Sequence, residues 1–124
     1  MIRATFYKNV ENGSLVGFNI KGHSGYAESG NDIVCASVSS MTMLFLNMIE
    51  VVLEICSDSY ELNVNEKKAE IDFKIDQKNG FKSEIFDAQK AEQISKALSC
   101  LMECIKSVSE EYSSFVKVAE KAVK

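Results

Sequence analysis

The sequence predicts an α+β fold in which a mostly antiparallel sheet carries two helices packed on one face. Two pairs of short stretches alternate apolar and polar residues, and each pair is followed by a long stretch with apolar residues at helical spacing. The chain has 124 residues, of which 46% are hydrophobic and 26% charged, as is typical of one globular domain. We therefore expect a single domain over residues 1–124.

The first pair of strands is predicted over residues 2–8 and 15–21, because apolar and polar residues alternate in both. Residues 11–13, Glu-Asn-Gly, lie between them and are typical of a turn, so the two form a β-hairpin. A glycine-rich loop follows over residues 22–31, which the glycines Gly22, Gly25 and Gly30 indicate.

The first helix is predicted to start after Asn31 or Asp32, since either side chain can cap a helix N-terminus. Its apolar residues recur at helical spacing: Val34, Val38, Met41, Phe45, Met48, Val52 and Ile55. Much of the opposite side is apolar too, which predicts either a central helix or one covered by a partner subunit. The stretch is long enough to span a bilayer, but Asn47, Glu50 and Glu54 interrupt it, so we expect a buried helix and no membrane.

The second pair of strands is predicted over residues 60–64 and 69–75, around a polar turn. A second helix follows from about residue 87 to about residue 112. Its predicted core stripe is Ala91, Ile94, Leu98, Leu101, Ile105 and Val108. Residues 115–119 alternate again and predict a closing strand, although residues 119–124 would equally suit a frayed helical end. The expected order is ββαββαβ.

The net charge of −4 gives no electrostatic support to nucleic-acid binding. The first six residues lack the basic and apolar regions of a signal peptide, so we expect a cytoplasmic protein with reduced cysteines. Cys100 and Cys104 lie four residues apart and could begin a metal site, yet no third ligand is evident. We therefore expect no metal and no cofactor, and we expect these two cysteines and Cys56 to be buried as small side chains.

The sequence contains one histidine, His23, in the glycine-rich loop, and Cys35 follows twelve residues later in the first turn of the predicted helix. The partial positive charge and unpaired N–H groups of a helix N-terminus favour a thiolate. A nearby imidazole can take the thiol proton and return it to a leaving amine, and free N–H groups at the helix start could hold a developing oxyanion. The glycines of the loop would let a substrate backbone approach closely. The arrangement predicts cysteine-nucleophile chemistry.

The residues alone leave alternatives open. His23 could be hydrogen-bonded to backbone, and Cys35 could be a buried apolar residue. Asp32 could orient the imidazole or simply cap the helix. Ser39, one helical turn after Cys35, could hydrogen-bond near the thiolate or could pack the helix against the sheet.

The segment over residues 22–39 resembles the ribosomal-processing cysteine protease family, Prp. The similarity lies in Gly22-His23, the glycine-rich loop, and then Gly30, Asp32-Ile33-Val34-Cys35-Ala36 and Ser39. The resemblance implies a bacterial, cytoplasmic, homodimeric cysteine peptidase with His23 and Cys35 as its catalytic pair and a mobile loop over residues 24–31. It implies that the substrate is the N-terminal extension of a large-subunit ribosomal protein (number twenty-seven).

Two rival functions belong to other classes. A non-catalytic ribosome-assembly factor would bind a basic ribosomal protein, which suits the acidic charge of the chain. A thiol redox protein would need a second cysteine near Cys35 in space, because none lies near it in sequence.

Overall fold

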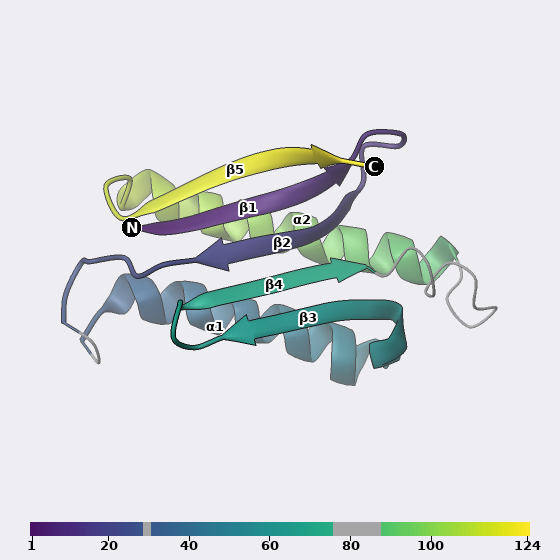
Figure 1. The fold of residues 1–124 in the computed structure, drawn as a ribbon, viewed down its shortest axis with the longest axis horizontal. Helices are drawn as coiled ribbons and strands as arrows, with labels where there is room; N and C mark the ends of the chain where they lie inside the picture. The colour runs from purple at the N-terminus through teal and green to yellow at the C-terminus, as the bar shows by residue number, and fades with distance from the viewer. Residues whose placement is uncertain (29–30, 76–87) are drawn as a thin grey trace.

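The computed structural model describes residues 1–28, 31–75 and 88–124, and it shows one sheet with both helices on the same face (Figure 1). The strands are β1 (Ile2–Asn9), β2 (Leu15–Lys21), β3 (Tyr60–Asn65), β4 (Glu70–Ile75) and β5 (Val116–Val123). The helices are α1 (Ile33–Asn47) and α2 (Ala88–Glu111), with short helical turns η1 (Met48–Val52) and η2 (Ser57–Ser59) between α1 and β3. The predicted α+β class and element order are confirmed.

The five strands lie in the order β3-β4-β2-β1-β5. All neighbours are antiparallel except β1 and β5, which run parallel over the whole length of β1. Parallel strands need a crossover connection, and α2 supplies it. The last element is therefore a strand that continues to Val123, and the alternative of a helical end over residues 119–124 is wrong.

An aromatic cluster fixes α1 against the sheet. Phe18 of β2 stacks on Phe73 of β4 with ring centroids 5.7 Å apart, and Phe45 of α1 meets Phe73 edge-on at 5.0 Å. Phe6 of β1 completes the cluster, and all four rings are buried. Edge-on and offset aromatic pairs add to the burial of their apolar area. This packing sets where the first turn of α1 lies relative to the end of β2.

Helix α1 buries Val34, Val38, Thr42 and Phe45 and leaves much of its other side exposed within this chain. Of the two expectations, a central helix is therefore wrong, and a helix covered by a partner subunit stays a prediction. Leu44 is 67% exposed and Val52 is 68% exposed. Beyond Asn47 the wide turn η1 replaces α-helical spacing, so Ile49 is buried while Met48 is exposed. By length and hydropathy, residues 33–52 could also cross a membrane, but a core helix of a soluble protein passes the same test.

Helix α2 follows its predicted stripe: Ile94, Leu98, Leu101 and Ile105 are buried against the sheet, and Ala91 and Val108 are half-buried. The expected burial of Cys56, Cys100 and Cys104 is wrong, since all three are exposed. Cys100 and Cys104 lie beside the stripe rather than in it, and they line a groove between α1 and α2. Both helices thus leave apolar or sulfur-bearing residues on the side away from the sheet.

Candidate active site

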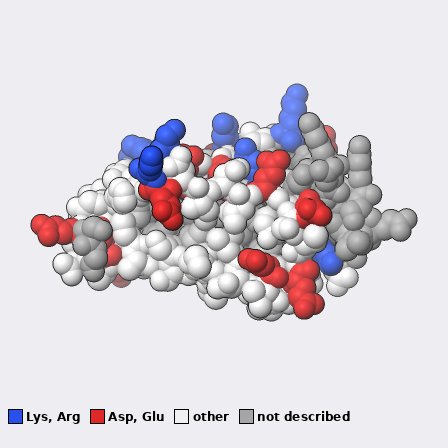
Figure 2. All heavy atoms as spheres, turned by 60° about the horizontal axis from the view of Figure 1, so that its bottom comes forward, with Lys and Arg blue, Asp and Glu red and all other residues white. Residues whose placement is uncertain are grey.

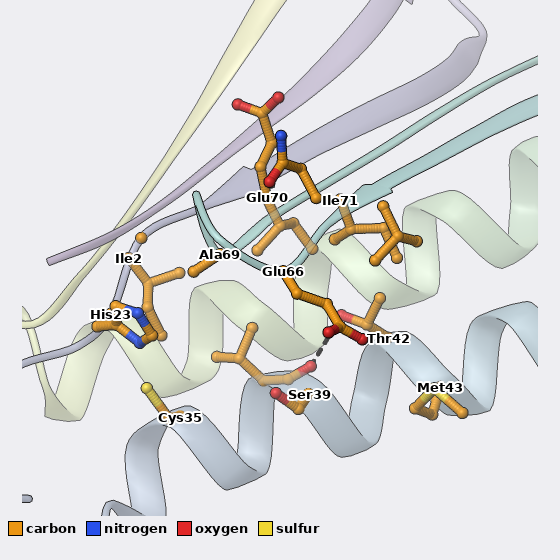
Figure 3. Close-up of a pocket in the computed structure, with 15 residues that line it drawn as sticks. Ile2, His23, Cys35, Ser39, Thr42, Met43, Glu66, Ala69, Glu70 and Ile71 are labelled. Atoms are coloured by element: carbon orange, nitrogen blue, oxygen red, sulfur yellow. Dashed lines mark hydrogen bonds between the residues drawn. The ribbon is translucent and has the colours of Figure 1, made fainter. Parts of the chain in front are cut away.

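A cleft of about 310 Å³ lies between the first turns of α1 and the β3–β4 hairpin (Figure 3). Its apolar lining comes from both sides and includes Ile2, Ile20, Val38, Met43, Val64 and Ile71. Its polar lining includes His23, Cys35, Ser39, Thr42, Asn65, Glu66 and Glu70. The cleft therefore joins an apolar wall to a thiol and an imidazole.

Gly22 places His23 at the rim of this cleft. Its φ of +101° is a left-handed conformation that favours glycine, and a Cβ there would collide with the carbonyl oxygen of Met1. The Gly22 N–H donates to the carbonyl of Ala69, at 2.9 Å, just before β4. The chain thus leaves β2 at a fixed angle, and the exposed ring of His23 turns toward the cleft (Figure 3).

Cys35 lies in the first turn of α1, and Asp32 caps that turn. Asp32 Oδ1 accepts hydrogen bonds from the N–H groups of Val34, at 3.0 Å, and of Cys35, at 2.9 Å. The Ser24 hydroxyl and these helix amides hold the pKa of Asp32 down at about 2. The cap therefore uses these two amides, so they are not free to hold an oxyanion in this arrangement.

Ser24 is the residue that sequence reasoning missed. It is 3% exposed and contacts the thiol directly: its N–H lies 3.3 Å from Cys35 Sγ, and Sγ lies 3.6 Å from its hydroxyl oxygen. The same hydroxyl donates to Asp32 Oδ2. The one signal in the sequence for a role of Ser24 is its position next to His23. The direction of a polar side chain in a glycine-rich loop cannot be predicted from the sequence.

Comparison with known proteins decides the family. The model of the family described as cysteine protease Prp matches residues 1–117 of this chain. The chain belongs to the Prp family. It is therefore a cysteine peptidase, as the segment over residues 22–39 predicted. No curated protein matches the chain.

Solved structures share the Prp fold along the whole chain. Prp from S. aureus with a covalently linked product peptide has a TM-score of 0.75 at 21% identity, covering 98% of this chain and 100% of that one. The same S. aureus protease with a substrate peptide has a TM-score of 0.72 at 20% identity, with the same coverage. SMU.848 from Streptococcus mutans has a TM-score of 0.69 at 27% identity, covering 99% of this chain and 96% of that one.

In this Prp-family chain, His23, Cys35 and Ser39 line the same cleft, and the His23 ring and the Cys35 sulfur lie at one end of it (Figure 3). No hydrogen bond between His23 and Cys35 occurs within the described residues. The contacts of Asp32 are to Ser24, the helix amides and the Ala27 N–H, so Asp32 acts here as a cap.

Two of the loop glycines can be placed. Gly22 lines the cleft, and Gly25 has a φ of +72° with open space around it. A left-handed φ with nothing nearby marks Gly25 as a turn that another residue would strain. Gly30 lies outside the described residues.

Acidic groups border the cleft on the side of the β3–β4 hairpin. Glu70 forms an ion pair with Lys21 at 3.6 Å, and Glu66 lies exposed at the turn. Across residues 1–28, 31–75 and 88–124, no group of three or more His, Cys, Asp or Glu side chains is arranged to hold a metal ion. The chemistry that this part of the chain offers is that of a thiol, an imidazole and carboxylates.

Proposed function

We propose that Cys35 is the nucleophile of this peptidase and His23 its general base and acid. The observation that carries the proposal is that both side chains lie at one end of a cleft with an apolar wall. The cysteine thiolate is the nucleophilic form, and an imidazole is the group most often used to move a proton near neutral pH. The catalytic domain extends over residues 1–124.

The reaction is thiol acyl transfer. His23 takes the proton of the Cys35 thiol, and the sulfur attacks the scissile carbonyl carbon to form a C–S bond. The C–N bond then breaks, and His23 gives its proton to the leaving amine. A water molecule, deprotonated by His23, attacks the thioester, and the carboxylate product leaves with the Cys35 thiol restored.

The substrate is the N-terminal extension of a large-subunit ribosomal protein (number twenty-seven), cleaved in the cytoplasm. The similarity to a ribosomal-processing protease of S. aureus, whose structures hold a substrate peptide and a covalently linked product peptide, supports this assignment. The lining also supports it, since the apolar wall suits hydrophobic side chains and the exposed carboxylate of Glu66 suits a basic flank.

The active form is a homodimer built on the outer side of the helices. Exposed apolar side chains of α1 and η1 gather there, including Leu44, Met48, Val51 and Val52. Figure 2 brings forward the edge where α1 and β3 lie in Figure 1, and it shows a broad area there without charged side chains. Exposed apolar side chains gathered in one area mark an interaction site in soluble proteins, and a second copy provides a matching apolar face.

Mass spectrometry of the extended ribosomal protein after incubation with the peptidase tests the function. Wild type should remove one short N-terminal fragment, and Cys35→Ala should remove none. Cys56→Ala is the matched control, because Cys56 is exposed and lies outside the cleft. Full cleavage by Cys35→Ala would contradict the proposed nucleophile. Stable binding with no cleavage by wild type would favour a non-catalytic assembly factor.

A further inference from the structure

Ser24 lies between the Cys35 sulfur and the Asp32 carboxylate. It follows His23 directly in the chain, and its side chain is almost completely buried between the Cys35 sulfur and the Asp32 carboxylate. A buried hydroxyl is normally fully hydrogen-bonded, so the partners of this one show what it does.

The single hydroxyl proton of Ser24 goes to Asp32 Oδ2. Its oxygen then accepts the Tyr26 N–H, at 3.2 Å, and the Cys35 S–H, at 3.6 Å. The Ser24 N–H donates to the same sulfur, at 3.3 Å. The sulfur thus contacts both the N–H and the hydroxyl of one residue, and the same hydroxyl links it to the Asp32 carboxylate.

We propose that Ser24 is a positioning residue that holds the Cys35 sulfur and lowers the cost of forming its thiolate by neutralising part of the charge on Asp32. A carboxylate near a thiol opposes loss of the thiol proton. The Ser24 hydroxyl on Oδ2 and the two helix amides on Oδ1 share that charge. When the proton leaves, the Ser24 N–H still donates to the thiolate. This inference rests on Cys35 as the nucleophile.

The other titratable groups around the thiol stay the same when Ser24 is changed. His23 faces it from the loop after β2, and Glu66 and Glu70 face the same cleft from the β3–β4 hairpin, with Glu70 paired to Lys21. Replacing Ser24 by Ala alters none of these charges. A change in the titration of the thiol in that variant therefore reports on the link between Ser24 and Asp32.

The expected direction follows from two opposed effects. Ser24→Ala removes the donor to Asp32, which leaves more negative charge near the sulfur and disfavours the thiolate. It also removes the acceptor of the S–H group, which favours the thiolate. Because S–H is a weak donor and this contact is 3.6 Å long, the charge effect is the larger.

The experiment measures the pH dependence of iodoacetamide alkylation at Cys35 in the full chain without substrate, with peptide mass spectrometry to separate the four cysteines. In Ser24→Ala we expect the midpoint to move to higher pH and the rate below the midpoint to fall by about threefold to tenfold. Ser24→Thr keeps the hydroxyl and should keep the wild-type profile. Peptidase kcat should fall in Ser24→Ala below the midpoint with KM unchanged.

Ser37→Ala is the matched control, because it removes a hydroxyl of α1 whose one hydrogen bond among the described residues is to the Val34 carbonyl. A Ser24→Ala profile equal to that of Ser37→Ala overturns the proposal, as does a folded Ser24→Thr that fails to restore the wild-type profile. If Ser24→Ala does not fold, Asp32→Asn decides: removing the charge should move the midpoint to lower pH, and an unchanged midpoint overturns the proposal. Alkylation needs no cleavage, so cleavage by Cys35→Ala would refute the proposed function separately.

Discussion

The chain places thiols in two contrasting surroundings. Cys35 opens on a cleft, and the hydrogen-bonding groups of Ser24 hold its sulfur. Cys104 lies in an apolar groove of about 80 Å³ between α1 and α2, beside Cys100 and among Met41, Leu44, Phe45, Met48, Ala97 and Leu101. Partial burial of its thiol and the neighbouring Cys100 raise the pKa of Cys104.

The contrast shows that exposure alone does not make a cysteine reactive. By whole-residue exposure Cys104 is exposed and Cys35 is only partly so. What distinguishes Cys35 is a backbone donor to its sulfur and an imidazole at the same end of the cleft. The groove around Cys104 offers apolar atoms instead, which suit packing against another copy of the chain rather than catalysis.

The largest effect should come from Cys35→Ala, which removes the nucleophile. We expect cleavage of the extended ribosomal protein to fall by at least about a thousandfold, because no other group takes over bond formation. Cys104→Ala should retain full cleavage. Equal losses of cleavage activity in the two variants would contradict the proposed difference between Cys35 and Cys104.

His23→Ala should lower the cleavage rate by about a hundredfold to ten-thousandfold, the usual range for loss of a general acid and base. Mass spectrometry of the extended ribosomal protein in timed samples gives the cleavage rate. The loss should reflect the missing proton transfer, so Cys35 should still be alkylated in this variant. Unchanged cleavage would show that another group moves the proton.

Leu44→Glu should weaken the proposed dimer, since it adds a charge to the exposed side of α1 near the groove of Cys104. Sedimentation at micromolar concentration should show a 13.8 kDa species for the variant and twice that mass for wild type. Val10→Glu is the control, because Val10 is an exposed apolar residue in the turn between β1 and β2, and it should leave the dimer intact. A wild-type monomer at this concentration would contradict the dimer.

Cys104 should be alkylated more slowly than Cys35 at neutral pH, because burial and the neighbouring Cys100 raise the pKa of Cys104 and leave less of it as the reactive thiolate. Peptide mass spectrometry of timed samples measures both rates in one experiment. Cys100→Ser should speed the reaction at Cys104 modestly, because burial, which that change leaves in place, raises the Cys104 pKa most. Faster alkylation at Cys104 than at Cys35 would reverse the comparison.

Asp32→Asn should have the smallest effect of these variants, a slight loss of stability, since Asn also caps helices well. The folded-state pKa of Asp32, about 2, lies below its ordinary value, so its ionised form stabilises the fold above about pH 4, and that contribution disappears as the pH falls through about 2. Thermal unfolding at several pH values should give a higher melting temperature for wild type than for Asp32→Asn near neutral pH, and this difference should disappear in acid. A difference that stays constant down to pH 2 would contradict this.

The sequence predicted the strands, both helices and a cap at Asn31 or Asp32, because these depend on local periodicity and on single polar residues. It predicted the burial of α2 for the same reason. The prediction of burial failed on the outer side of α1 and at Cys100 and Cys104. An apolar residue indicates only that burial is favourable, and the sequence does not show whether another part of this chain covers it. It also missed Ser24, whose contacts depend on the path of the loop.

The sequence by itself determined that His23 lies in the loop after a strand, that Cys35 lies in the first turn of a helix, and that the chain resembles the Prp family over residues 22–39. Spacing and capping are local, so they can be read without coordinates. Only the tertiary structure decided that the β3–β4 hairpin lines the cleft and that Ser24 holds the sulfur. Those contacts arise because the packing of α1 on the sheet brings distant segments together, and no local pattern encodes that geometry.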